Sequence, residues 1–121
     1  MAMQKIRIAP SLLASDLTRL GDEVKALEKA GADLFHFDIM DGHFVPNITI
    51  GPAIVKDLRA HTDLPFEAHL MIERPLKYID RFIEAGADII TVHVETLSAA
   101  DFRRQASSLH KRGLKMAVAL N

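Results

Sequence analysis

The sequence predicts an α/β protein in which short strands alternate with helices and pair in a parallel sheet. β-rich runs alternate with helical patterns along all 121 residues. The residues Ala-Gly-Ala-Asp at 30–33 recur 55 residues later at 85–88, and Gly113 follows Gly86 by a further 27. A step of about 27 residues fits one strand-plus-helix unit. Strands that cross over through helices pair in parallel with one hand.

Five strands are predicted by short runs rich in apolar and β-branched residues, at residues 6–10, 33–38, 65–70, 88–93 and 114–120. Four strand-plus-helix units and a final strand amount to about half of a closed eight-unit barrel, which needs about 250 residues. A doubly wound sheet is the alternative, but no glycine-rich phosphate turn follows the first strand. The length does not allow a complete barrel.

Four helices are predicted by their caps and apolar faces. The first begins after Ser15 or Asp16 and ends at Gly31, and the second begins at Pro52. Their apolar faces contain Leu17, Leu20, Val24 and Leu27 in the first helix and Ile54, Val55 and Leu58 in the second.

The third helix has Pro75 in its first turn and ends at Gly86. The fourth begins with a capping box formed by Ser98 and Asp101 and ends at Gly113. Their apolar faces contain Leu76, Ile79, Phe82 and Ile83 in the third helix and Phe102, Ala106 and Leu109 in the fourth.

The composition argues against several classes of partner. Fifteen basic and sixteen acidic residues give a net charge of -1, so no basic surplus favours nucleic acid or an anionic membrane. No apolar run approaches the roughly 20 residues that span a bilayer. The sequence has no cysteine, so a bound metal ion must use histidine and carboxylate ligands. The lack of cysteine is compatible with the cytoplasm.

Histidine and aspartate side chains lie towards the carboxyl ends of the second and third predicted strands. Alternation places His36 and Asp38 on one face, opposite Phe35 and Phe37, and His69 lies at the end of the next strand. The carboxyl ends of parallel strands are where such folds build sites, so these three side chains are candidate ligands of one divalent ion. Taken singly, each would also fit a hydrogen-bonded core histidine or an aspartate that caps a turn.

The loop at residues 39–51 is longer than the two to six residues usual between a strand and its helix. Such loops are often functional covers, and an ordered excursion with two turns is the alternative. Four apolar residues indicate that it packs over another part of the molecule: Phe44, Val45, Ile48 and Ile50. Among the remaining histidines, His93 is a weaker candidate for substrate contact. His43 lies in the loop, and His61 and His110 are expected in solvent.

Three stretches carry a resemblance to a known family: Ile-Ala-Pro-Ser-Leu-Leu-Ala-Ser-Asp at 8–16, His-Phe-Asp-Ile-Met-Asp-Gly-His-Phe-Val-Pro-Asn at 36–47 and Glu-Ala-His-Leu-Met at 67–71. Together they resemble the ribulose-phosphate 3-epimerases, in register from about residue 6 to Asn121. The resemblance implies a TIM barrel. Residues 1–121 would then be a single domain, an N-terminal (β/α)4 half-barrel plus a fifth strand, with outer helices on a parallel sheet.

The resemblance also implies an activity and its residues. The family interconverts D-ribulose 5-phosphate and D-xylulose 5-phosphate through an ene-diolate, in the pentose phosphate pathway. His36, Asp38 and His69 match its metal ligands, and Asp38 also matches an acid/base. Ser11, Met40, Met71 and His69 match positions that contact the substrate. The implied cofactor is a divalent ion: zinc, iron(II), manganese or cobalt. The second acid/base aspartate, also the fourth ligand, and the phosphate loop belong to the family's second half, which this chain lacks.

Inversion next to a ketone needs acid/base groups on both faces, so efficient epimerisation by a lone monomer is not expected. One hypothesis is therefore a cytoplasmic enzyme that needs its remainder or a second chain. Another is a catalytically incomplete half-barrel, truncated or engineered, that self-associates. A hexulose-phosphate 3-epimerase is a third. Exposed strand edges predict a homo-oligomer, and no nucleic-acid or membrane partner is expected.

Overall fold

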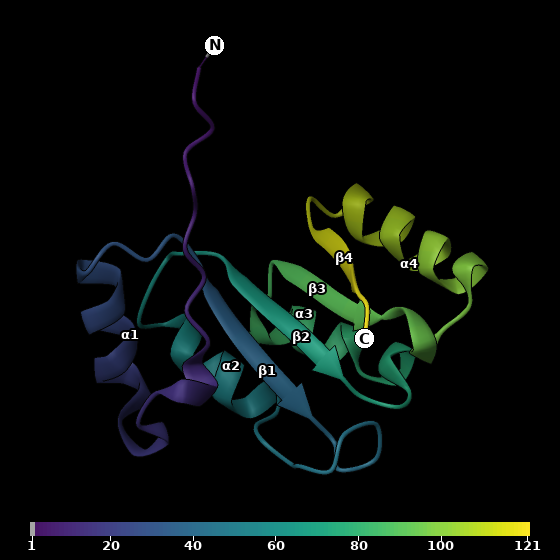
Figure 1. The fold of residues 1–121 in the computed structure, drawn as a ribbon, viewed down its shortest axis with the longest axis horizontal. Helices are drawn as coiled ribbons and strands as arrows, with labels where there is room; N and C mark the ends of the chain where they lie inside the picture. The colour runs from purple at the N-terminus through teal and green to yellow at the C-terminus, as the bar shows by residue number, and fades with distance from the viewer. Residues whose placement is uncertain (1) are drawn as a thin grey trace.

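The computed structural model describes residues 2–121, in which one parallel sheet has the strand order β1-β2-β3-β4 (Figure 1). The strands are β1 (Phe35–Met40), β2 (Phe66–Met71), β3 (Ile89–His93) and β4 (Lys115–Ala119). The helices are α1 (Leu20–Lys29), α2 (Pro52–Arg59), α3 (Ile79–Ala85) and α4 (Ala99–Lys111). Each strand reaches the next through one helix. The predicted α/β class is confirmed, and none of the helices in residues 2–121 is long and apolar enough to cross a membrane.

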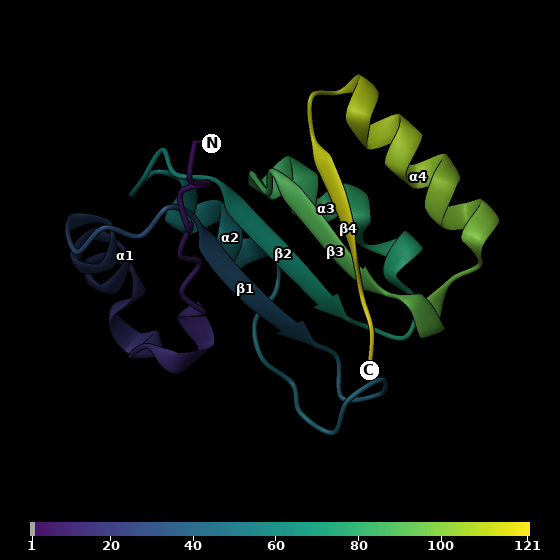
Figure 2. The same ribbon diagram turned by 45° about the horizontal axis from the view of Figure 1, so that its top comes forward.

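The sheet has one covered face and one open face. α2 and α3 lie behind the strands, and the opposite face carries no helix in either view of residues 2–121 (Figures 1 and 2). The side chains of β1 alternate accordingly between buried and half-buried. Phe35 and Phe37 are fully buried and pack against the ring of Phe66. His36 and Asp38 therefore point to the open face, as predicted.

The strand predicted at residues 6–10 does not form as a regular strand. This segment runs beside β1, where the Ile8 carbonyl accepts from Leu34 and the Pro10 carbonyl accepts from His36. Its own donors do not complete a ladder, because Pro10 has no N–H and the Ile8 N–H donates to the Asp33 carboxylate at 2.8 Å. Only an isolated bridge between Ser11 and His36 remains. The other four predicted strands are confirmed within two residues at each end.

Two helices begin with a 3-10 turn that the sequence did not predict. Leu17–Arg19 precedes α1, with Asp16 accepting from the Thr18 N–H as its cap, and Pro75–Lys77 precedes α3. A 3-10 turn has three residues per turn, so its side chains leave the face expected of an α-helix. Leu17 and Leu76, assigned to the apolar faces of these helices, are therefore 46% and 40% exposed, and the predicted burial of Leu76 is wrong.

Arg59 joins α2 to the beginnings of β2 and β3. Its guanidinium donates to four acceptors at 2.6–3.2 Å: the carbonyls of Thr62, Leu64 and Gly86 and the carboxylate of Asp88. It also lies 3.6 Å from the centroid of the Phe66 ring. Gly86, at φ 113°, ends α3 beside it, as predicted for a C-terminal glycine. These contacts fix the ends of the strands opposite to the histidines.

Candidate metal centre

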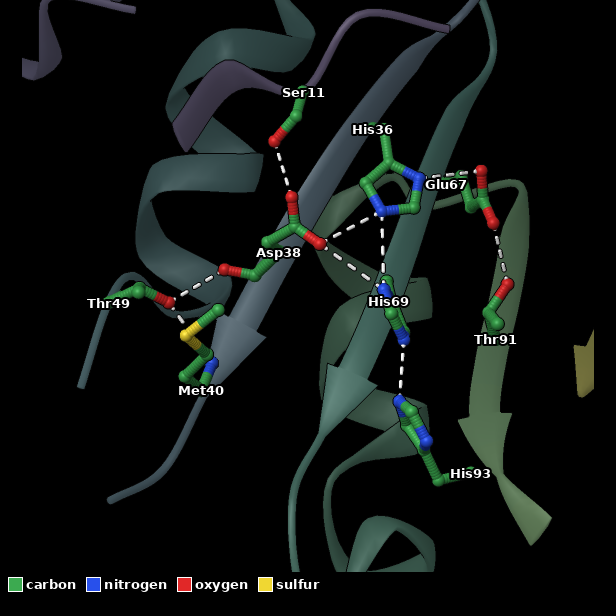
Figure 3. A network of polar contacts seen from close by, with 9 residues as sticks. All are labelled: Ser11, His36, Asp38, Met40, Thr49, Glu67, His69, Thr91 and His93. Atoms are coloured by element: carbon green, nitrogen blue, oxygen red, sulfur yellow. Dashed lines mark hydrogen bonds and ion pairs between the residues drawn. The ribbon is translucent and has the colours of Figure 1, made fainter. Parts of the chain in front are cut away.

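The three side chains predicted as ligands come together on the open face of the sheet (Figure 3). His36 and Asp38 share a face of β1, and the parallel register places His69 of β2 directly beside Asp38. The three side chains are 17–22% exposed, so the cluster is partly open to solvent. Among the residues that the structure describes, no other three His, Cys, Asp or Glu side chains come together in this way.

The three ligand atoms have the mutual spacing of donors around one ion. His36 Nε2 lies 3.0 Å from Asp38 Oδ1 and 3.3 Å from His69 Nδ1, and His69 Nδ1 lies 3.2 Å from Asp38 Oδ1. Donors about 2.1 Å from an ion lie about 3.0–3.4 Å apart at angles of about 90–109°. Two imidazoles and a carboxylate are also a common donor set for divalent transition metals. The residues present therefore fit a divalent metal ion.

Asp38 is held in place by two further segments of the chain. The Ser11 hydroxyl donates to Asp38 Oδ2, and the Thr49 hydroxyl donates to the Asp38 carbonyl at 2.6 Å. Burial acts against a charge on Asp38, but the hydroxyl of Ser11 and the charge of His36 outweigh it and lower the pKa of Asp38 below its usual value. Asp38 is therefore a carboxylate at neutral pH, with one oxygen facing both histidines.

His36 is anchored on its other nitrogen by a carboxylate. Its Nδ1 lies 2.9 Å from Glu67 Oε2, and the Thr91 hydroxyl donates to Glu67 Oε1 at 2.7 Å. The hydrogen bond to Glu67 raises the pKa of His36 in spite of the burial of the ring, and the same bond lowers the pKa of Glu67. Asp38 and Glu67 thus favour positive charge at this point of the sheet.

His69 packs against a buried histidine, His93. The rings of His69 and His93 stack with centroids 4.9 Å apart, and their Nε2 atoms lie 2.8 Å apart. Burial lowers the pKa of His69, and the charge of His36 acts in the same direction. His93 Nδ1 is buried without a hydrogen-bond partner among the described residues, and Glu95 Oε2 lies 3.6 Å from it. His93, a weaker candidate for substrate contact, is 6% exposed and lies against His69.

The long loop after β1 packs against this end of the sheet through some of its apolar residues. The Phe44 ring lies 4.9 Å from that of His93, and Ile50 packs against the core, whereas Ile48 is 77% exposed. The Asp41 carboxylate accepts from the backbone N–H groups of His43 and Phe44 in the loop and of Glu73 beyond β2. Burial opposes a charge on Asp41, but these three donors outweigh it and lower its pKa.

Met40 and Met71, predicted to contact substrate, are register partners at the ends of β1 and β2. Alternation places them on the same face as the ligands, two residues beyond Asp38 and His69 along the strands. Met40 lies beside Thr49 in Figure 3, and Met71 is buried. His61 and His110 are exposed, as expected, and His43 in the loop is exposed as well.

The sequence pattern alone predicts no role for Glu67 or Thr91. A usable signal was present, because both are polar side chains at inward positions of strands, in line with His69 and His93 on the same face. What alternation could not provide was the contact between neighbouring strands. This contact depends on the register of β1, β2 and β3.

The fold and the cluster define an α/β protein with a His-Asp-His site on the face, and towards the C-terminal ends, of parallel strands. Parallel α/β enzymes build their sites at these ends. The chain belongs to the ribulose-phosphate 3 epimerase family, whose model matches residues 7–121.

Individual relatives agree with this assignment. The chain is 52% identical over 116 residues to the ribulose-phosphate 3-epimerase of Bacillus subtilis, covering 96% of this chain and 52% of that protein. It is 48% identical over 116 residues to the chloroplastic ribulose-5-phosphate-3-epimerase of Arabidopsis thaliana, covering 96% of this chain and 41% of that protein. The chain therefore spans about half the length of the curated relatives it matches.

A solved structure supports the fold independently. A mandelate oxidase mutant with benzaldehyde, a TIM-barrel protein, superposes with a TM-score of 0.61 at 20% sequence identity. The match covers 96% of this chain and 41% of that one. The chain thus has the architecture of part of a TIM barrel, in agreement with the predicted fold class.

Proposed function

We propose that this chain supplies one half of the active site of a ribulose-phosphate 3-epimerase and that residues 1–121 form the N-terminal half-barrel of that enzyme as a single domain. The observation that carries the proposal is the convergence of His36, Asp38 and His69, with ligand atoms 3.0–3.3 Å apart. Membership of the family and the names of the relatives support the reaction and a sugar-phosphate substrate. Such a substrate, in the pentose phosphate pathway, is consistent with a cytoplasmic location.

In this proposal, His36, Asp38 and His69 hold one divalent ion, with zinc, iron(II), manganese and cobalt as the candidates. When bound, the ion acts as a Lewis acid that stabilises negative charge on the ketone and neighbouring hydroxyl oxygens of the substrate. The Ser11 hydroxyl holds Asp38 in the orientation that this needs. In this proposal the substrate contacts Ser11, Met40, Met71 and His69. Ser11 bonds to Asp38, and the other three lie on the same face of the sheet as the ligands.

Asp38 is the acid/base on one face of the substrate. Its lowered pKa keeps it ionised, so it can accept the proton from the carbon next to the ketone and return it. The same carboxylate cannot reach the opposite face, so inversion needs a second acid/base group from a longer chain or another molecule. This chain alone is therefore expected to exchange the proton rather than invert the carbon efficiently.

Deuterium exchange tests this function. The chain is incubated in D2O with a divalent ion and either D-ribulose 5-phosphate or D-xylulose 5-phosphate, and incorporation at C3 is followed by NMR. We expect metal-dependent exchange in one epimer, lost in Asp38→Asn and retained in the matched surface variant Asp57→Asn. A folded, metal-bound chain that neither exchanges nor epimerises would support the incomplete scaffold instead. Six-carbon ketose phosphates in the same assay test the hexulose-phosphate alternative.

We propose further that a second copy of the chain covers the outer edge of β4, as expected of a half-barrel that self-associates. β4 pairs only with β3 in the part of the chain that the structure describes. Val94, Val118 and Leu120 lie around it and are 48%, 49% and 75% exposed. Unpaired edges beside apolar surface favour association. Sedimentation equilibrium at micromolar concentration is expected to give a dimer or larger species, and a stable, dispersed monomer would contradict the proposal.

A further inference from the structure

Glu67 contacts the metal centre only through the far side of a ligand. His36 Nε2 faces Asp38 and His69, whereas His36 Nδ1 faces Glu67 at 2.9 Å (Figure 3). The two nitrogens lie on opposite sides of the imidazole ring. Glu67 is therefore placed beyond the ring from the point where the three donor atoms converge, and it is not one of the clustered ligands.

We propose that Glu67, held by Thr91, is a positioning residue that fixes the tautomer and orientation of His36 for metal binding. The inference rests on the proposed metal centre and deepens it. A carboxylate that accepts from Nδ1–H leaves the lone pair on Nε2 and points it at the cluster. Histidine ligands are commonly oriented in this way, and loss of such a partner typically weakens metal binding 10–100-fold.

The sheet itself builds this arrangement. His36 and Glu67 are register partners on adjacent strands, so their side chains leave the same face side by side. Thr91 lies on the next strand, is 6% exposed, and donates its hydroxyl to the second oxygen of Glu67. Both carboxylate oxygens of Glu67 are thus engaged, which prevents rotation of the group away from His36.

The charge of Glu67 contributes in addition to its geometry. A carboxylate that accepts a hydrogen bond from Nδ1–H stabilises positive charge on the imidazole ring. The ring therefore becomes a stronger electron-pair donor to a metal cation through Nε2. Substitution by glutamine separates the two effects. The amide oxygen of glutamine can still accept from Nδ1–H, but it carries no charge.

Metal titration by calorimetry, with cobalt(II) and zinc(II), tests the inference on the whole chain. We expect Glu67→Ala to weaken binding 10–100-fold, and Glu67→Gln to lie between Glu67→Ala and wild type. Glu84→Gln, a matched change at an exposed position of α3, is expected to bind like wild type. The d–d absorption of bound cobalt(II) and the NMR signal of the His36 Nδ1–H report the ligand geometry directly. That proton is expected to exchange slowly with solvent in wild type and rapidly in Glu67→Ala.

Substitution of Thr91 provides a second test that leaves Glu67 intact. Thr91→Val is close in volume and removes only the hydroxyl, so we expect weaker metal binding that Thr91→Ser restores. Circular dichroism checks that each variant is folded. If wild type binds no divalent ion, the proposed centre fails and the inference with it. If wild type binds an ion and folded Glu67→Ala and Thr91→Val bind it equally well, the inference alone is overturned.

Discussion

Replacement of Arg59 by methionine is expected to destabilise the fold by about 2–4 kcal/mol without changing the metal centre. Its guanidinium makes four hydrogen bonds at the N-terminal ends of β2 and β3 and lies on the Phe66 ring. A hydrogen bond to a charged group contributes about 1.5–3 kcal/mol. The side chains of Arg59 and Asp88 are 28% and 48% exposed, so water can take over part of the hydrogen bonding that the substitution removes. The free energies of the four hydrogen bonds are therefore not additive.

Urea unfolding at 25 °C, followed by circular dichroism, measures this loss against a total stability of about 5–15 kcal/mol. Arg59→Lys is the control, because it keeps the charge but not the planar fork, and it is expected to recover less than half of the loss. Two results would refute the reasoning. One is Arg59→Met within about 0.5 kcal/mol of wild type. The other is a folded Arg59→Met chain that binds metal more weakly, since the ligands lie at the other end of the strands.

Three further predictions concern the stability of the fold. Gly86→Ala should cost more than about 1 kcal/mol in chemical unfolding, because its Cβ would lie 2.5 Å from the Arg59 side chain. Gly31→Ala, with nothing within 4 Å, should cost less. Ser98→Ala removes the cap of α4 and should lower stability by about 1 kcal/mol in thermal unfolding. Asp41 has a lowered folded pKa, so the stability that it adds over Asp41→Asn is full above about pH 4 and disappears as the pH falls through that folded value. A difference that grows towards low pH would contradict this.

Much of the fold could be predicted because residues near in sequence mark where the helix of a strand-plus-helix unit begins or ends. Gly86 ends α3 with a positive φ, and the Ser98 hydroxyl accepts from the Asp101 N–H at the start of α4. The prediction of a strand at residues 6–10 was wrong because a strand forms only where its backbone groups find hydrogen-bond partners on a neighbouring strand. β-rich composition does not reveal that the Ile8 N–H is taken by an aspartate side chain. Likewise, apolar periodicity does not distinguish a 3-10 turn from an α-helix, which is why Leu76 was expected to be buried.

The candidate ligands could be predicted because alternation in a strand fixes the face, and a parallel sheet aligns the ends of its strands. Alternation alone predicts that His36 and Asp38 share a face, and the alignment of strand ends is also needed to place His69 beside them. The partners of the ligands depend on register, which the sequence pattern does not specify to one residue. For this reason the support of His36 by Glu67, and of Glu67 by Thr91, became visible only in the structure.

The proposed function depends most on whether His36, Asp38 and His69 hold a cation together. Equilibrium dialysis of the metal-stripped chain against zinc(II) or manganese(II), with the ion counted by elemental analysis, measures this directly. We expect one ion per chain for wild type and none for the double variant His36→Ala with His69→Ala, with both proteins folded by circular dichroism. Wild-type protein that retains no ion, or a double variant that retains as much as wild type, would contradict it.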